Sequence, residues 1–376
     1  MRIVVAAGGT AGHVNPALAF AETFRQNRPD AEITFVGRED GMESRLVRTR
    51  GFSFYPIDIH GFKRSLSFRS ILYNLRTVYC LAKTSVQCFL FMRQQKPDLV
   101  VGFGGYVSGP VVREAAKAGI PTAIHEQNSF PGVTSRLLSA KVDKIFVANS
   151  DSSERLGYPE KTIVVGNPVS ADIFAADRVK AREKFGLSDG QTCILSFGGS
   201  LGSATINQVM AHVFMQAKGR KDLFFLHATG EIDTTGFEKT LEESGLSTAD
   251  FSCRVSQYID DMADCLAASD LVISRSGAIT ISELAVVGRA SYLIPSPYVS
   301  ENHQYFNAMT LGNIGAAVVE EEKGMDYRKT AESILELAAD RSRLIRMGNC
   351  ARQIAVTDSA DRIYQEVVGL IKGQKV

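Results

Sequence analysis

The feature that most constrains the fold is an apolar strand, a glycine-rich turn and a helix, in that order, which occurs twice along the chain. A strand expected at Arg2–Ala7 leads into the turn GGTAGH (residues 8–13) and a helical pattern from about Asn15 to Gln26. Pro16 then falls in the first helical turn, where its missing N–H costs nothing. A second strand, Cys193–Phe197, leads into GGSLGS (residues 198–203) and a helix that opens near Ala204. The two halves share an architecture, although their sequences are too different to be a repeat.

Further short apolar runs alternate with helical patterns, which predicts parallel, doubly wound α/β sheets. The remaining strands are expected at Ile33–Val36, Leu99–Phe103, Thr122–His125, Lys144–Val147, Thr162–Val165, Leu223–His227, Phe251–Val255, Leu271–Ser274 and Ser291–Ile294. A chain of 376 residues is long enough for two domains. We expect an N-terminal domain at 1–166 and a C-terminal domain at 167–357, with a last helix at about 358–372 that could pack back on the first domain.

Bulk properties exclude several classes of protein. The net charge of +1 argues against a nucleic-acid binder. The N-terminus does not resemble a signal peptide, and no uncharged apolar stretch is long enough to predict a transmembrane helix. The six cysteines are scattered without the spacing of a metal site, so we expect reduced thiols in a cytoplasmic protein and no metal.

Both glycine-rich turns are candidate phosphate-binding loops, because glycines let backbone N–H groups approach an anion at a helix N-terminus. Neither turn matches a complete nucleotide-binding motif, and an ordinary tight turn is an equally good interpretation. His13 is either a general base at the mouth of a ligand site or a helix-capping histidine. In the second turn, Ser200 could donate its hydroxyl to a phosphate oxygen, and Asn207 lies on the helix that follows.

Other polar segments follow predicted strands, where ligand sites concentrate in α/β sheets. The segment from Arg275 to Glu283 joins a small-residue turn to a helix, so Arg275 and the N–H groups suit a diphosphate and Glu283 suits ribose hydroxyls. A solvated glutamate on a helix face is the alternative for Glu283. The sequences GGYVSGP (104–110), HEQN (125–128) and NHQYFN (302–307) are further candidates, the last because amides suit sugar hydroxyls.

The stretch from Gly61 to Lys96 has seven basic residues and no acidic ones. Phe62, Leu66 and Phe68 are expected in a loop, and a helix is expected from about Ser70 to Gln94. One helix face is apolar and is expected in the core: Ile71, Leu75, Val78, Ala82, Val86 and Phe89. The basic face is either simply solvated or directed at an anionic membrane surface, and we favour the membrane.

At these motifs the chain resembles the MurG family of UDP-N-acetylglucosamine transferases of peptidoglycan synthesis. The segments GGTAGHVNPALA, GGYVSGP, HEQNSFPG, GNPV, GGSLGSATIN and RSGAITISELAVVGRASYLIPSPY recur in the family's order and span most of the chain. The resemblance implies the GT-B architecture, which has two Rossmann-like domains with parallel sheets facing across a cleft. It also implies an inverting transferase that needs no metal or other cofactor.

The resemblance assigns roles to individual residues. His13 resembles the candidate general base, with Tyr106 and Glu126 on the acceptor side as alternatives. Other residues resemble contacts to the sugar, phosphates, ribose and uracil of the donor: Thr10, Ala11, Gly12, Asn128, Ser200, Ile259, Ala278, Ile279, Thr280, Ile281, Ser282, Glu283, Gln304 and Asn307. Asn207 and Arg275 are further candidate substrate contacts, on their position and chemistry alone. Ser170 replaces an arginine that some members carry after GNPV, which puts one phosphate contact in doubt, and Ala11 replaces a glycine.

The function implied is transfer of GlcNAc from UDP-GlcNAc to the MurNAc 4-hydroxyl of lipid I, at the cytoplasmic face of the bacterial inner membrane. The implied partners are this donor, this acceptor, the anionic membrane surface and other proteins of cell-wall synthesis. Three alternatives stay open: a GT-B enzyme with another lipid acceptor, a UDP-GlcNAc 2-epimerase, and a non-catalytic nucleotide-sugar-binding protein.

Overall fold

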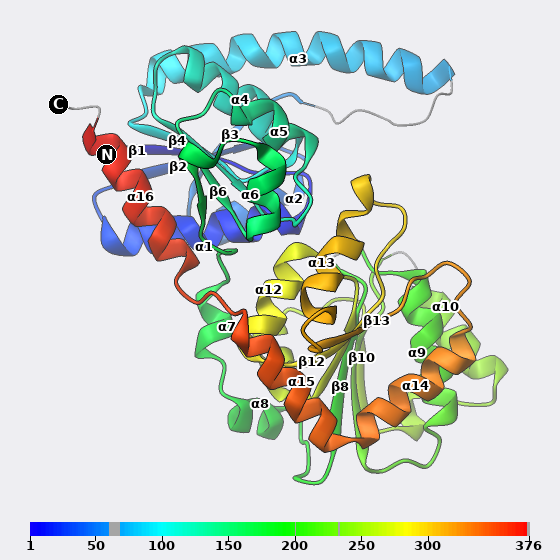
Figure 1. Cartoon of the computed structure of the whole chain (residues 1–376). Helices are drawn as coiled ribbons and strands as arrows, with labels where there is room; N and C mark the ends of the chain where they lie inside the picture. The colour runs from blue at the N-terminus through cyan, green and yellow to red at the C-terminus, as the bar shows by residue number, and fades with distance from the viewer. Residues whose placement is uncertain (60–67, 200, 232–233, 374–376) are drawn as a thin grey trace. The chain divides into compact units, whose positions relative to one another are not determined.

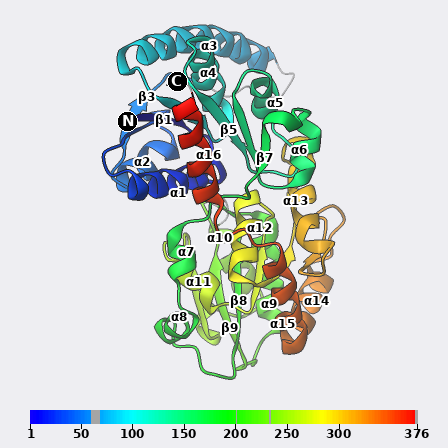
Figure 2. The same ribbon diagram turned by 60° about the vertical axis from the view of Figure 1, so that its left-hand side comes forward.

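The structure is a computed structural model that describes residues 1–59, 68–199, 201–231 and 234–373, without the side chains of 68–79, 81–82, 234–235 and 300. The chain divides into two compact units (Figures 1 and 2). Unit 1 contains Met1–Ser170 and Thr357–Val376, and unit 2 contains Ala171–Val356.

Unit 1 is built on a parallel sheet with the strand order β3-β2-β1-β4-β5-β6-β7. Its strands are β1 (Arg2–Ala6), β2 (Glu32–Gly37), β3 (Ser53–Pro56), β4 (Leu99–Gly102), β5 (Thr122–Glu126), β6 (Lys144–Val147) and β7 (Thr162–Val164). Its helices are α1 (Ala11–Asn27), α2 (Met42–Thr49), α3 (Phe68–Gln95), α4 (Gly105–Lys117), α5 (Val133–Ser139), α6 (Ser150–Leu156) and α16 (Ser359–Gly373).

Helices cover both faces of this sheet, which explains why its central strands are apolar throughout. Along β1, Ile3 and Val5 pack in one core with residues of α1 and α16. Val4 and Ala6 pack in the other core, with residues of α3, α4 and α5. Figure 1 shows α3 and α4 on the opposite side of the sheet from α1 and α16.

The last helix, α16, completes the first of these cores although it comes almost 200 positions after the rest of the unit. Its Ile363 and Val367 are fully buried, and the ring of Tyr364 meets that of Phe24 edge to face at 5.2 Å. Lys144 on β6 forms an ion pair with Glu366. The carboxyl-terminal helix is therefore an integral layer of unit 1.

Unit 2 has a second parallel sheet, with the strand order β10-β9-β8-β11-β12-β13. Its strands are β8 (Thr192–Phe197), β9 (Leu223–Ala228), β10 (Cys253–Ser256), β11 (Leu271–Ser274), β12 (Ala290–Leu293) and β13 (Ala317–Val319). Its helices are α7 (Ala171–Ala175), α8 (Arg178–Lys184), α9 (Ala204–Gln216), α10 (Thr234–Glu243), α11 (Met262–Ala268), α12 (Ala278–Val287), α13 (His303–Gly312), α14 (Tyr327–Ala339) and α15 (Arg341–Gln353).

Each sheet reverses its strand order once, and these reversals determine where a ligand can bind. In unit 1 the reversal lies between β1 and β4, and in unit 2 it lies between β8 and β11. At such a point the connections leave the neighbouring strands toward opposite faces, so the loops at their carboxyl ends diverge and leave a crevice. Both glycine-rich turns follow the strands at these reversals.

The parallel α/β architecture predicted from the sequence is confirmed. Two strands were missed, β3 and β13, and both are short strands at a sheet edge, where few flanking residues are buried enough to give a pattern. The predicted start of the first helix was wrong, since α1 begins at Ala11 and Pro16 lies inside it. The turn after β1 is tighter than expected because Gly9 adopts φ +88° and redirects the chain within two residues.

Candidate functional site

In unit 1, three loops meet at the carboxyl ends of neighbouring strands: 7–10 after β1, 103–104 after β4, and 127–132 after β5. The first two loops touch backbone to backbone. A Cβ added to Gly105 would lie 2.2 Å from the carbonyl oxygen of Gly8, and Gly105 has φ +75°. Only glycine fits this position without displacing the loop after β1.

Glu43, which sequence reasoning missed, supports the same turn from α2. Its side chain is buried, and its carboxylate accepts N–H bonds from Arg38 at 3.1 Å and from Gly9 at 3.4 Å. A carboxylate in the sequence GMES just after a strand was the available signal. Glu43 therefore fixes the backbone from which the predicted ligand-binding residues Thr10, Ala11 and Gly12 extend.

His13 and Tyr106 come together around this turn. The Nδ1 atom of His13 lies 3.1 Å from the hydroxyl of Thr10, and its ring lies against Gly104, where a Cβ would come within 2.6 Å of Cδ2. The ring of Tyr106 lies against Gly9. Its hydroxyl and the carboxylate of Asp40 both bond to the guanidinium of Arg38. Both side chains are partly exposed at the carboxyl end of the sheet, as a reacting group requires.

Glu126 has a different setting from the other two candidate bases. It is buried, and its carboxylate accepts hydrogen bonds from the N–H of Asn128 at 3.0 Å, the amide Nδ2 of Asn128 at 3.0 Å and the N–H of Gly132 at 2.9 Å. Both oxygens are thus engaged in holding the loop after β5. Asn128, by contrast, is partly exposed.

His125 holds Gly166, near the end of the segment Met1–Ser170 of unit 1. Its Nε2 bonds to the carbonyl of Gly166 at 2.8 Å, and its Nδ1 accepts from the amide of Gln127 at 3.0 Å. Burial lowers the pKa of His125 to about 4, so the neutral ring with a proton on Nε2 fits both contacts. Asn167 adds a bond from its side-chain amide to the carbonyl of Gln127 at 3.2 Å.

In unit 2, the turn after β8 packs against the end of β9. A Cβ on Gly202 would lie 2.6 Å from the carbonyl oxygen of Thr229, and the amide of Asn207 donates to the same oxygen at 2.9 Å. Asn207 is fully buried, so in this structure it supports the turn from behind. Ser200 lies outside the described residues.

The segment after β11 is held by residues predicted to touch the donor. Arg275 forms an ion pair with Glu322 at 2.6 Å, and both side chains are mostly buried. Asn307 donates to the carbonyl of Ser276 at 3.2 Å and is itself buried. Gln304 accepts the N–H of Ser296 at 2.9 Å. In this structure all three side chains are engaged in holding the polar loops in place.

Helix α12 begins at the reversal in unit 2, with its positive end at the carboxyl edge of the sheet. Among the predicted contacts, Ile279 and Ile281 are buried, as is Ile259 in the loop before α11. Ala278 and Thr280 are partly exposed, and the hydroxyl of Ser282 donates to the carbonyl of Ala278 at 3.2 Å. The surrounding protein desolvates the carboxyl group of Glu283 and raises its pKa to about 7, although part of the residue is exposed.

Part of the predicted apolar face of helix α3 is exposed, so the prediction that this face lies in the core was wrong for those residues. Val86 and Phe89 were expected in the core, but their side chains are 59% and 42% exposed, and Leu90 beside them is 58% exposed. The buried face is formed by Thr84, Cys88, Phe91 and Met92, because α3 packs on α4 with that side. The helix also begins at Phe68, so that residue is not in a loop. Residues 60–67 and the side chains of Arg69, Ile71, Leu75, Arg76 and Val78 lie outside the described part.

Within the described residues, no group of three or more His, Cys, Asp or Glu side chains is arranged to hold a metal ion. No helix in that part of the chain is long and apolar enough to cross a bilayer.

Comparisons with known proteins identify related sequences and structures. Residues 3–147 match the glycosyltransferase family 28 N-terminal domain, and residues 193–363 match the family's C-terminal domain. The chain is 38% identical, over 100% of its length and 99% of the relative's, to the UDP-N-acetylglucosamine–N-acetylmuramyl-(pentapeptide) pyrophosphoryl-undecaprenol N-acetylglucosamine transferase of Acetivibrio thermocellus.

Two solved structures are similar over nearly the whole chain. The Acinetobacter baumannii MurG structure has a TM-score of 0.75 and 29% identity, and the match covers 98% of this chain and 99% of that one. A Neisseria meningitidis UDP-GlcNAc 2-epimerase has a TM-score of 0.68 and only 15% identity, and the match covers 98% and 100%. The second likeness shows a shared fold alone.

The contact between Gly105 and Gly8 gives a prediction with a matched control. Gly105→Ala and Gly119→Ala both place an alanine at positive φ, +75° and +70°, but nothing lies within 4 Å of a Cβ at Gly119. We expect Gly119→Ala to lower the free energy of unfolding by about 1–2 kcal/mol. Gly105→Ala should cost about 1–3 kcal/mol more, because its Cβ overlaps a carbonyl oxygen. Urea unfolding measures both, and equal losses would contradict a close contact.

Proposed function

Because the chain belongs to the UDP-N-acetylglucosamine–N-acetylmuramyl-(pentapeptide) pyrophosphoryl-undecaprenol N-acetylglucosamine transferase family, within glycosyltransferase family 28, we propose that it makes lipid II from lipid I. The 4-hydroxyl oxygen of MurNAc attacks the anomeric carbon of UDP-GlcNAc. The bond from that carbon to the diphosphate oxygen breaks, and UDP leaves with the electron pair. A base on the protein takes the hydroxyl proton, and the anomeric configuration inverts.

The observation that carries this proposal is the setting of His13 at the strand reversal of unit 1. If the Nδ1–H of His13 donates to Thr10, whose hydroxyl is 3.1 Å away, Nε2 is left with a lone pair. That nitrogen is the atom that accepts the proton in our proposal. Thr10 then acts as a positioning residue that holds the ring of His13, since its hydroxyl can pair with Nδ1 in either tautomer.

The hydrogen bonds of Glu126 favour His13 rather than Glu126 as the base. Both oxygens of its buried carboxylate already accept N–H bonds from the loop after β5, so neither is directed at a substrate hydroxyl in this structure. Glu126 instead holds Asn128 and the loop that follows β5. Tyr106 remains on the acceptor side, with its hydroxyl near the guanidinium of Arg38.

The donor diphosphate and ribose are proposed to bind at the strand reversal of unit 2. The start of α12 offers a positive helix end to the departing diphosphate. Glu283, one and a half turns along that helix, accepts the ribose hydroxyls. Gln304, Asn307 and Asn207 contribute by holding the loops, as their hydrogen bonds to neighbouring backbone atoms indicate.

Two rival functions share the fold. The epimerase likeness rests on 15% identity, against 38% to the transferase of Acetivibrio thermocellus, so the transferase is favoured. A transferase with another lipid acceptor would share the donor residues of unit 2 and differ in unit 1. The acceptor therefore has to be tested directly.

We also propose that unit 1 binds the cytoplasmic face of the inner membrane through α3. Val86, Phe89 and Leu90 expose apolar surface on this helix. Arg93 stacks over the ring of Phe89 at 5.7 Å, and Lys83 on the same helix is also exposed, although it pairs with Asp58 at 3.2 Å. Apolar side chains flanked by basic ones suit the boundary between acyl chains and anionic headgroups. A lipid-linked acceptor would be reached from that surface.

The proposed reaction predicts that purified protein releases UDP from UDP-GlcNAc only when a short-chain lipid I analogue is present. The product should be heavier than the analogue by one GlcNAc, as measured by mass spectrometry. UDP release without the analogue, with formation of an epimerised sugar, would instead identify an epimerase.

In the same assay, His13→Ala should lower kcat by about 10²–10⁴-fold and leave donor affinity nearly unchanged. An equal loss of kcat and donor affinity would remove His13 from the role of base.

The raised pKa of Glu283 predicts pH-dependent binding of UDP. The carboxylate form accepts the ribose hydroxyls, so affinity should rise as the pH passes upward through about 7. Between pH 6 and pH 8 the dissociation constant should fall about tenfold more for the wild type than for Glu283→Gln. Calorimetry of both proteins isolates this effect from titration of the UDP phosphate, which is common to both. Parallel pH profiles would show that Glu283 does not bind the ribose as a carboxylate.

The membrane proposal predicts that Val86→Ser/Leu90→Ser lowers affinity for phosphatidylglycerol vesicles about tenfold or more, from the apolar surface lost. Val179→Ser is the control, since Val179 is 65% exposed on α8 of unit 2. Vesicle co-sedimentation at low and high salt measures both. If the control and the double variant bind equally, α3 is not the membrane contact.

A further inference from the structure

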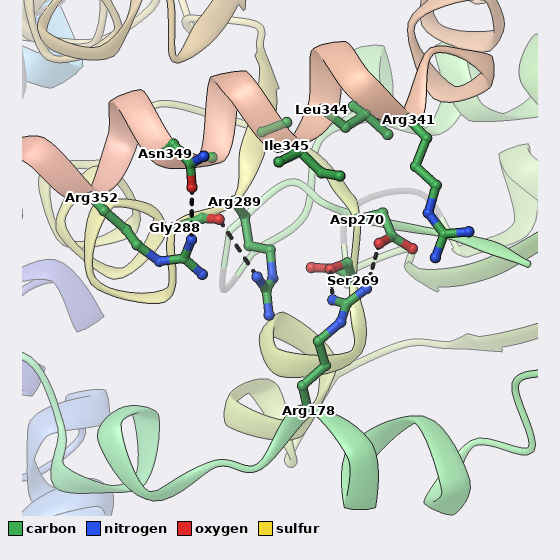
Figure 3. Close-up of a pocket in the computed structure, with 12 residues that line it drawn as sticks. Arg178, Ser269, Asp270, Gly288, Arg289, Arg341, Leu344, Ile345, Asn349 and Arg352 are labelled. Carbon is green, nitrogen blue, oxygen red and sulfur yellow. Dashed lines mark hydrogen bonds and ion pairs between the residues drawn. The ribbon is translucent and has the colours of Figure 1, made fainter. Parts of the chain in front are cut away.

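A pocket at the amino edge of the unit 2 sheet is unusually rich in arginine. It has a volume of about 320 Å³ and is lined by Arg178, Arg289, Arg341 and Arg352, with Asp270 as its one acidic residue (Figure 3). Asp270 and Arg289 directly precede β11 and β12. Since these strands are parallel, the pocket lies at the opposite end of the sheet from the start of α12 and the proposed diphosphate site.

Part of this charge has a structural explanation. Helix α11 ends at Ala268, and its last carbonyls accept N–H bonds from Arg178 and Arg289, including those from Arg289 to Leu266 at 2.9 Å and to Ala267 at 2.8 Å. Arg352 similarly donates to the carbonyl of Val287 at the end of α12, at 3.2 Å. Two helix carboxyl ends together carry about one negative charge at most.

The remaining positive charge is not balanced by carboxylates. Asp270 is already shared by Arg178 and Arg182, and it also accepts the N–H of Cys193 at 2.8 Å. In the described part of the chain, no carboxylate lies within ion-pair distance of Arg289, Arg341 or Arg352. Four guanidiniums therefore face one carboxylate and two helix ends, which leaves a net charge of about +2 in the recess.

The four arginine side chains line the same pocket. Arg341, Ile345, Asn349 and Arg352 lie on one face of α15, and Figure 3 shows the guanidinium of Arg289 between those of Arg352 and Arg178. Burial, together with Arg178 and Arg352, lowers the pKa of Arg289 to about 10. Like charges held this close gain free energy when an anion enters between them.

We propose that this pocket binds a phosphate-bearing anion, at a second site distinct from the donor and acceptor sites. Phosphate is the ligand class indicated, because several guanidiniums converge on a volume near the lower limit for a small-molecule site. The phosphate can belong to a soluble metabolite or to a lipid headgroup. The bound anion links α8, α12 and α15, and α15 ends just before the segment that returns to unit 1.

The test uses inorganic pyrophosphate and calorimetry of the full chain at low salt, with saturating UDP present to keep pyrophosphate out of a diphosphate site in unit 2. Arg341→Glu should weaken pyrophosphate binding about tenfold or more. Arg346→Glu is the matched control, because Arg346 is exposed on the same helix and does not line the pocket. Arg352→Gln should also weaken pyrophosphate binding. Because this change removes a charge without reversing it, a loss of affinity cannot come from an added carboxylate.

A second arm distinguishes a lipid source. Co-sedimentation with phosphatidylglycerol vesicles is measured in the Val86→Ser/Leu90→Ser background, with and without Arg341→Glu. Binding of pyrophosphate that depends on Arg341 supports a soluble ligand, and vesicle binding alone that depends on it supports a lipid phosphate. Equal effects of Arg341→Glu and Arg346→Glu, or no binding in either arm, would overturn the proposal. The UDP affinity of the variants reports separately on the donor site.

Discussion

The close approach of Gly105 to the carbonyl of Gly8 is the contact on which the unit 1 site depends. A Cβ at Gly105 would lie 2.2 Å from that oxygen, so the loops after β1 and β4 meet with no side chain between them. This contact, with the carboxylate of Glu43 beneath Gly9, sets the start of α1 and hence the position of His13. Because α4 starts at the same contact, Tyr106 is placed by it as well.

Several residues predicted from the sequence to contact the donor or the acceptor support loops in this structure. Glu126 holds the backbone of Asn128 and Gly132, Asn307 holds Ser276, and Arg275 is paired with Glu322. A buried polar group that satisfies a loop backbone is costly to replace, since the loop's N–H or C=O would lose its partner. The loop backbone that such a residue holds therefore restricts which side chain can replace it. His13, Tyr106 and Glu283 differ from the buried Glu126 and Asn307 in being partly exposed.

The two ends of the unit 2 sheet present positive charge in different ways. At the carboxyl edge, charge comes from a helix start and glycine-rich backbone, which suits an anion that must bind and leave in each turnover. At the amino edge, it comes from arginines that also cap the carboxyl ends of α11 and α12. The second arrangement couples anion binding to the packing of helices near the chain's return to unit 1.

The sequence alone determined the parallel α/β class, the paired glycine-rich turns and the family, because these depend on local patterns of apolar residues and glycines. It did not reveal the edge strands β3 and β13, the early start of α1 or the exposed face of α3. Those depend on which surface a neighbouring element covers, as α4 covers Cys88 and Met92 but leaves Val86 in solvent. The supporting role of Glu43 and the arginine pocket likewise required the tertiary structure, since residues from separate helices and strand ends meet there only after the sheets form.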